Sequence, residues 1–233
     1  MSRMSPITAA VLTVLLAACS KSPPPAAPEA TQPAANNAAA SQAPAASTSA
    51  PAAGATEGST EDPAVVAKKR KIEFALSEQT LANDPHGQWA TSASASTTYR
   101  DAKDNAPYAA SQATGAPNVL QYSDDGNGWA PKDADAGIEW LQVGFAKPVN
   151  ATGIRVRQNS GGGAIIKVEL QDSSDAWHAA YEGVDGAKYD EYNWWFKQSF
   201  AKTPYLVKGA KITLATNAVS GWNEIDAVQL LSE

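Results

Sequence analysis

The sequence predicts an all-β fold, an antiparallel sandwich of short strands, for the chain from residue 88 onward. Three observations support this prediction. Short segments alternate apolar and polar residues with a period of two, as strands with one buried face do. Turn-forming residues separate these segments. The same part of the chain contains no long amphipathic helix, and its length of about 145 residues suits a sandwich.

Three consecutive segments carry the clearest strand pattern, and each places its apolar residues on one face. They span residues 138–145, 153–158 and 166–170, with the inward residues Leu141, Val143 and Phe145, then Ile154 and Val156, then Ile166, Val168 and Leu170. The residues between these segments are rich in Gly, Pro, Asn and Ser, which favour turns. We therefore expect adjacent antiparallel strands that share one buried face.

Further strands follow toward the C-terminus, at residues 177–182, 194–200, 210–214 and 223–231. The last one changes parity, because Ile225 and Ala227 share one face while Val228 and Leu230 share the other. One extra residue in the strand would turn both pairs toward the core. The sequence therefore predicts a β-bulge near Ala227 and Val228.

The N-terminus has the form of a bacterial export signal. Residues 1–18 contain Arg3, an apolar run and then small residues, and the run is too short to span a bilayer as a helix. Leu16-Ala17-Ala18-Cys19 resembles the lipobox of bacterial lipoproteins, in which the cysteine is acylated. The resemblance implies a lipid-anchored protein of the bacterial cell envelope. Ser20 after the cysteine favours the outer membrane.

Residues 19–63 form an Ala/Pro-rich segment that we expect to be a disordered tether. It has almost no large apolar side chains with which to offset the entropy of ordering. Residues 64–87 are interpreted as a connecting segment. Asp62 and Pro63 suit a helix start, whereas the alternation of Ile72 and Phe74 suits a strand, so both structures remain open.

Composition and charge argue against two classes of function. The formal net charge is −6, from 18 basic and 24 acidic residues, which gives no support to nucleic-acid binding. Two histidines are too few for a histidine-based metal site, and the sequence lacks a nucleophile elbow and a phosphate loop. The acidic pair Asp133 and Asp135 lies in a polar loop where solvated acids are expected. We therefore predict a noncatalytic protein.

The order of several motifs is similar to that of the discoidin, or coagulation factor 5/8 type C, domains, which are galactose-binding-like jelly rolls. The motifs are Ser92-Ala93-Ser94-Ala95-Ser96 before Tyr99, residues 110–118, Gly128-Trp129-Ala130-Pro131, residues 139–145, Ile154-Arg155-Val156, Trp177 and residues 224–230. The resemblance covers residues 88–233. It implies an eight-stranded antiparallel jelly-roll β-sandwich whose loops at one end bind sugars, lipid head groups or proteins.

The resemblance also implies a structural calcium ion in the loop before Trp129. In the family the ion is bound by backbone carbonyls, an acidic side chain of the loop and a carboxylate of the closing strand. The matching candidates are Asp124, Asp125 and Asn127 from the loop, with Glu224 or Asp226 from the last strand. Calcium requires six to eight oxygen ligands, which a loop of this composition can supply. The alternative is that the loop is only a turn, since Asp, Asn and Gly favour turns for local reasons.

Sugar sites in this superfamily use exposed aromatic faces and planar polar side chains on loops. Trp194 and Trp195 are adjacent in a strand, so one of them must point away from the core, either as an open platform or packed under a neighbouring loop. Arg155 and Arg157 share an outward face and would either bind a carboxylate or remain solvated or paired within the chain. The predicted ligand-binding residues are Tyr192, Trp194, Trp195, Asn159, Arg155, Arg157 and Trp222.

These observations lead to the hypothesis of a lipid-anchored, noncatalytic binding module that recognises glycan or another ligand of the cell envelope. The alternative is a module that docks onto another envelope protein. An amino-acid pattern alone does not separate the two, because both use exposed aromatic side chains on loops.

Overall fold

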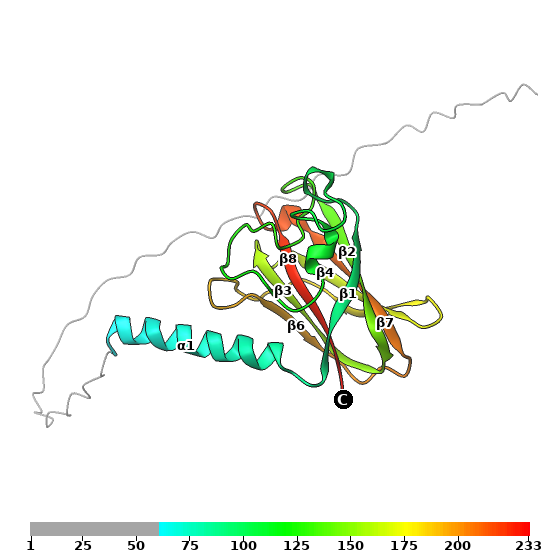
Figure 1. Cartoon of the computed structure of the whole chain (residues 1–233), viewed down its shortest axis with the longest axis horizontal. Helices are drawn as coiled ribbons and strands as arrows, with labels where there is room; N and C mark the ends of the chain where they lie inside the picture. The colour runs from blue at the N-terminus through cyan, green and yellow to red at the C-terminus, as the bar shows by residue number, and fades with distance from the viewer. Residues whose placement is uncertain (1–60) are drawn as a thin grey trace, which may run out of the picture. The chain divides into compact units, whose positions relative to one another are not determined.

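The computed structural model describes residues 61–233. The predicted signal peptide, Cys19 and nearly all of the predicted tether lie outside the described residues. The described part begins with one α-helix, continues into eight β-strands and includes three short 3₁₀ helices. Figure 1 shows the helix beside the strands.

The strands confirm the predicted all-β fold of the chain after the helix. Their bounds are β1 Gly87–Ala95, β2 Ile138–Val149, β3 Ala151–Ser160, β4 Ile165–Asp172, β5 Trp177–Glu182, β6 Trp195–Ser199, β7 Val207–Ala215 and β8 Glu224–Ser232. All strand pairs are antiparallel. Strands β2 to β8 correspond to the seven predicted segments, whereas β1 was not predicted from alternation. In its Ser- and Ala-rich sequence, the residues on the two faces of the strand differ little in hydrophobicity.

The strand order β5-β4-β7-β2-β1-β8-β3-β6 describes two sheets that share β1. The first residues of β1, Gly87 to Trp89, pair with β8, and the residues from Ala90 onward pair with β2. A register shift between Ala90 and Ser92 accompanies the change of partner. A bulge bends and twists a strand, and here it lets β1 pass from one sheet to the other. This is the eight-stranded jelly-roll sandwich implied by the resemblance.

The core lies between the two sheets and joins apolar residues from both. Leu141, Val143 and Phe145 of β2 are buried as predicted, as are Ile154 and Val156 of β3. Burial of each such side chain contributes about 1.5–3 kcal/mol. The packed core holds the ends of the strands rigidly, and the loops at those ends can therefore position a site.

Two bulges decide which residues enter this core. On β8 the register shifts between Ile225 and Ala227, so that Asp226 is the extra residue and Ile225, Val228 and Leu230 all join the core, while Ala227 is fully buried outside the core cluster. The predicted bulge is confirmed, one residue earlier than expected.

The second bulge corrects a prediction. On β4 the register shifts between Ile165 and Lys167, which places Ile165 in the core and leaves Ile166 only half-buried. The prediction that Ile166 faces the core was therefore wrong, because alternation assumes an unbroken ladder.

The helix α1 spans Pro63–Ala82, which settles the open choice between helix and strand. Asp62 caps it by accepting a hydrogen bond from the Ala64 amide, with Pro63 in the first turn, as predicted. None of the helices within residues 61–233 is both long and apolar enough to span a bilayer.

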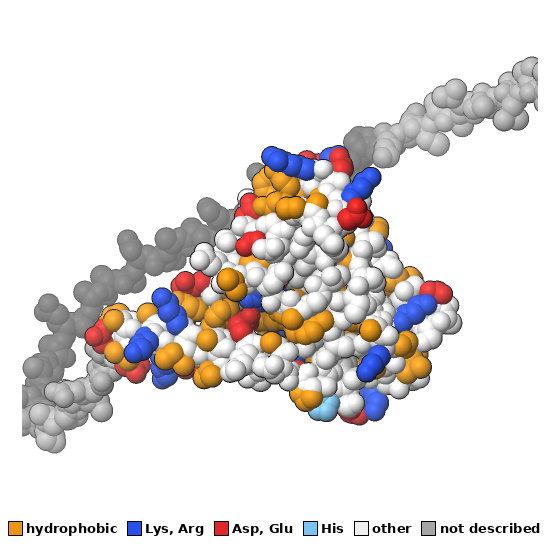
Figure 2. All heavy atoms as spheres, viewed as in Figure 1, with side chains coloured by type: hydrophobic (Ala, Val, Ile, Leu, Met, Phe, Trp, Pro, Cys, Tyr) orange, Lys and Arg blue, Asp and Glu red, His pale blue; other side chains and the backbone are white. Residues whose placement is uncertain are grey.

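The C-terminal half of α1 packs on the outer face of the sheet that contains β3, β6 and β8. Glu78 binds Arg157 of β3 and the indole of Trp195 of β6, and the Leu81 carbonyl accepts from Gln229 of β8. The opposite side of α1 faces solvent, and Figure 2 shows hydrophobic and basic side chains together along this helix. Val65, Ile72 and Leu76 are about half exposed there, at 50%, 50% and 57%.

Candidate functional site

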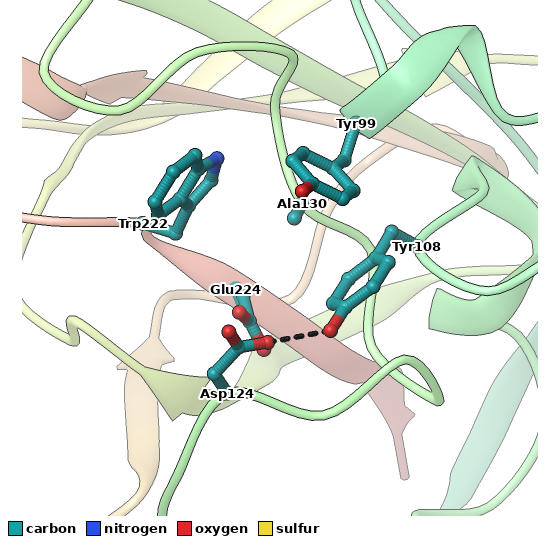
Figure 3. Close-up of a pocket in the computed structure, with 6 residues that line it drawn as sticks. All are labelled: Tyr99, Tyr108, Asp124, Ala130, Trp222 and Glu224. Carbon is teal, nitrogen blue, oxygen red and sulfur yellow. Dashed lines mark hydrogen bonds between the residues drawn. The ribbon is translucent and has the colours of Figure 1, made fainter.

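A pocket at the loop end of the sandwich brings together aromatic and acidic side chains that are far apart in the sequence. It encloses about 260 Å³, counting the space open to solvent, and is lined by Tyr99, Tyr108, Asp124, Ala130, Trp222 and Glu224. Figure 3 shows these residues around a common space, with Glu224 at the start of β8 and the others on loops or on the first 3₁₀ helix.

Three aromatic rings form one wall of the pocket. The ring of Tyr99 lies edge-on to both Tyr108 and Trp222, with centroid distances of 5.1 and 5.7 Å and interplanar angles of 73° and 86°. Edge-to-face pairs of this kind are favourable and fix the orientation of each ring. Trp222 remains 37% exposed, so part of its surface is open to a ligand.

Backbone contacts hold the loops that carry these rings. Trp129 is fully buried and exchanges two backbone hydrogen bonds with Ile225 of β8, which places Ala130 at the pocket. Tyr99 in turn donates its amide to the Ala130 carbonyl. Tyr108 has a φ of 65°, in the left-handed region that non-glycine residues seldom adopt, and its amide donates to Gly126. Such strained residues concentrate at functional sites.

The carboxyl groups of Asp124 and Glu224 face each other at the base of the pocket (Figure 3). The Tyr108 hydroxyl donates to Asp124 at 2.7 Å, and the Asp125 amide donates to Glu224 at 3.1 Å. Burial, together with the charge of Asp124, raises the pKa of Glu224 to about 8. The hydrogen bond to Asp124 raises the pKa of Tyr108 to about 12.

The predicted calcium ligands do not form one coordination set. Asp226 binds Arg157 and accepts hydrogen bonds from the Asn118 and Val119 amides, so its oxygens are already engaged. Asp125 accepts from the backbone and side chain of Asn127 and thereby forms the turn that was the alternative interpretation. Within residues 61–233, no group of three or more His, Cys, Asp or Glu side chains is placed to hold a metal ion. The predicted side chains therefore do not assemble a coordination set by themselves, and the calcium ion stays a prediction.

Trp194 and Trp195 do not provide an open aromatic platform, so of the two alternatives left open by the sequence the structure shows the packed one, and their listing as ligand-binding residues is corrected. Their exposed fractions are only 2% and 6%. Helix α1 covers them, because Phe74 packs on Trp194 with a centroid distance of 5.5 Å and Glu78 accepts from the Trp195 indole. Alternation placed one indole outside the core, whereas both lie outside the core cluster and pack against the helix rather than under a loop.

Arg155 and Arg157 bind carboxylates of their own chain. Arg157 is buried, contacts Glu78 and Asp226, and lies 4.0 Å from the centre of the Trp194 ring. Arg155 pairs with Asp84 at 2.8 Å, just after α1. Their predicted role in binding an external ligand is therefore wrong, because both guanidinium groups hold the helical segment in place.

The other predicted ligand residues have different environments. Trp222 lies in the pocket, as expected of a ligand-binding residue. Asn159 is fully buried and donates to Glu224, so it supports the pocket from behind. Tyr192 is half-buried and lies beneath the guanidinium of Arg70 of α1, at 4.5 Å from its ring centre, away from the pocket.

Tyr99 and Tyr108 were not predicted as ligand-binding residues. They lie on irregular loops where no periodicity applies, and Tyr99 appeared only as part of a family motif. An available indication was the concentration of Asp, Asn and Pro from residue 101 to 107, between the two tyrosines. Loops of this kind carry binding residues more often than strands do.

The comparisons with known proteins give the following matches. The family model described as pappalysin-1, SD scarf domain, C-terminal, matches residues 78–188, which is less than half of the chain. No curated protein sequence matches the chain.

Among solved structures, the chain is similar to chitosan-binding module 1 of a chitosanase/glucanase from Paenibacillus sp. IK-5, at 11% identity and a TM-score of 0.46, covering 60% of this chain and 94% of that one. It is also similar to the family 32 carbohydrate-binding module of Clostridium perfringens NanJ, solved with galactose, at 17% identity and a TM-score of 0.44, covering 63% and 99%. At such low identity, ligands do not transfer between chains, and the pocket of this chain is interpreted from its own side chains.

Proposed function

We propose that this protein is a noncatalytic binding module that holds a sugar residue of a glycan in the pocket lined by Tyr99, Tyr108 and Trp222. The observation that carries the proposal is the convergence of three oriented rings and two carboxyl groups in one open pocket. Ligand pockets typically combine an apolar wall with a few convergent polar groups.

Each part of the pocket has a role in this proposal. The apolar face of a sugar ring packs on the exposed part of Trp222 and on the tyrosine rings. Asp124 and Glu224 accept hydrogen bonds from sugar hydroxyls, and charged acceptors make the stronger hydrogen bonds. The loops are already fixed by the Trp129 contacts, so that little ordering is required on binding.

The experiment is a glycan array with the full chain, followed by calorimetry on each sugar that binds. Trp222→Ala is expected to weaken binding at least tenfold. Trp177→Ala is the matched control, because Trp177 on β5 has almost the same exposure, 38% against 37%, and does not line the pocket. Equal affinities for the two variants would exclude the pocket. A blank array, together with cross-linking of an envelope protein, would favour the alternative of a protein-docking module.

The proposed location is the outer membrane of a bacterial envelope, with the chain anchored through an acylated Cys19. The support is the sequence Leu16-Ala17-Ala18-Cys19 at the end of an export-like segment. Two or more acyl chains give stable membrane attachment. Mass spectrometry of the N-terminal peptide should find a modified Cys19, and Cys19→Ser should release the protein from the membrane fraction. An unmodified cysteine in the native protein would exclude this anchor.

A further inference from the structure

The lining of the pocket contains acidic side chains and no basic ones. Asp124 and Glu224 supply its two carboxyl groups, and no Lys, Arg or His is among its six lining residues. The groups that donate to these carboxyls are neutral: the Tyr108 hydroxyl, the Asp125 amide and the Asn159 side-chain amide.

Two arginines near pocket residues do not pair with these carboxyls. Arg157 is bound to Glu78 and Asp226. Arg100 lies over the ring of Tyr99, with its guanidinium carbon 5.1 Å from the ring centre, and is not a lining residue. Within residues 61–233, the two facing carboxyls of the pocket therefore have no ion pair with a basic side chain.

The aromatic wall favours the same kind of ligand group. The faces of Tyr and Trp rings carry partial negative charge and attract a cation within about 6 Å of the ring centre. Tyr99, Tyr108 and Trp222 are held edge-to-face beside the carboxyl pair, and a cation bound there would meet rings and carboxyls together. Such an interaction strengthens when the cation is partly desolvated, as it is in a pocket.

From this arrangement we infer that the ligand of the pocket carries a positively charged amino group, and that the glycan is one with free amino sugars. This inference rests on the proposed sugar-binding function and adds the chemical class of the sugar. An ammonium group would donate to Asp124 and Glu224 while the sugar ring packs on Trp222. A sugar carboxylate would be repelled by the same pair.

The test compares two oligosaccharides that differ only at the amine, a glucosamine oligomer and its N-acetylated form. Calorimetry with the full chain near neutral pH is expected to show at least tenfold tighter binding of the free amine. Raising the salt concentration should weaken binding of the amine and leave that of the acetylated form nearly unchanged. Equal binding of the two forms, or tighter binding of the acetylated one, would overturn the inference.

Variants that each remove one carboxylate test whether the pocket causes the preference for the free amine. Asp124→Asn and Glu224→Gln are each expected to reduce the preference for the amine at least threefold. Asp133→Asn is the control for net charge, because Asp133 is an exposed acid that does not line the pocket. Melting curves verify that each variant is folded, and the exposed Asp124 offers a second variant if Glu224→Gln does not fold. Equal losses in all three variants would assign the preference to overall charge and overturn the inference.

The two proposals can fail separately. If neutral sugars bind through Trp222 and the amine makes no difference, the pocket remains a sugar site and only the preference for amino sugars is wrong. If no sugar of any class binds, the proposed function fails and the inference fails with it.

Discussion

Two regions of this protein contain the same kinds of side chains but differ in whether their charged groups have an oppositely charged partner. In the contact between α1 and the β3–β6–β8 sheet, the ring of Trp194 lies against Arg157, whose guanidinium binds Glu78 and Asp226. In the pocket, aromatic rings lie beside Asp124 and Glu224, which lack a cationic partner in the pocket lining. Burial of a charge is costly unless the charge is paired. The first region is therefore a completed structural contact, whereas the second is suited to a ligand.

The first prediction breaks the completed contact and has the largest expected effect. Arg157→Ala removes the partner of Asp226, whose side chain is fully buried, and should lower the free energy of unfolding by about 3–5 kcal/mol. Urea denaturation measures the loss. Arg155→Ala is the matched control, because its ion pair with Asp84 is partly exposed, and about 1 kcal/mol is expected there. Similar losses for the two variants would contradict the distinction.

The second prediction concerns the attachment of α1. Glu78→Ala removes the bonds to Arg157 and Trp195 and should cost about 2–3 kcal/mol. An undocked helix of this length is only marginally stable in water, so amide exchange should accelerate across α1 while the strands remain protected. Glu73→Ala, an exposed position on the same helix, should change neither quantity. Unchanged exchange in Glu78→Ala would show that other contacts hold the helix.

The same comparison explains which features the sequence could predict. Alternation identified seven strands and the parity change of β8, because the two faces of a strand differ in polarity over several residues. The sequence also predicted Trp222 as a ligand-binding residue, but it predicted the two acids of the pocket only as calcium ligands. It assigned Trp194, Trp195, Arg155 and Arg157 to a ligand, because period-two reasoning places the arginines and one of the tryptophans outside the core but says nothing about what covers that face.

The covering helix was difficult to recognise for a related reason. One side of α1 contacts the sheet through Phe74, Glu78 and Leu81, while the opposite side exposes Ile72 and Leu76. With apolar residues on both sides, the helix has no single apolar stripe to indicate where it packs. The two tyrosines of the pocket were not predicted for a different reason. Contacts between loops depend on residues that are distant in the sequence.

The third prediction uses the carboxyl pair of the pocket, which α1 does not touch. The pKa of Glu224 is raised from 4.5 to about 8, so between these values the folded protein keeps a proton that the unfolded chain releases. The free energy of unfolding should therefore fall as pH rises through this window and become level above it. Because solvent reaches the pocket, we expect a total fall on the order of 1–2 kcal/mol.

Glu224→Gln separates this effect from other titrating groups. The difference between the denaturation curves of the two proteins, followed from about pH 5 to about pH 9, isolates the contribution of one carboxyl. In the variant, the fall attributed to Glu224 should be absent. A wild-type protein whose free energy of unfolding rises over this pH range would contradict the raised pKa of Glu224.

The smallest expected effect tests whether the carboxyl pair serves a metal. The side chains of the two facing carboxyls supply fewer oxygens than the six to eight that calcium requires, and Asp226 is already bound to Arg157. Adding calcium to chelator-treated protein should therefore leave the melting temperature unchanged.

If the protein had a calcium site, calcium at a hundred times its Kd would add about 2.7 kcal/mol to the free energy of unfolding, which corresponds to roughly 5–10 °C for a protein of this size. A rise of that kind, if absent in Glu224→Gln, would mean that the loop rearranges around the ion. The unpaired acids would then belong to a structural metal, and the inferred amino sugar would have to bind elsewhere.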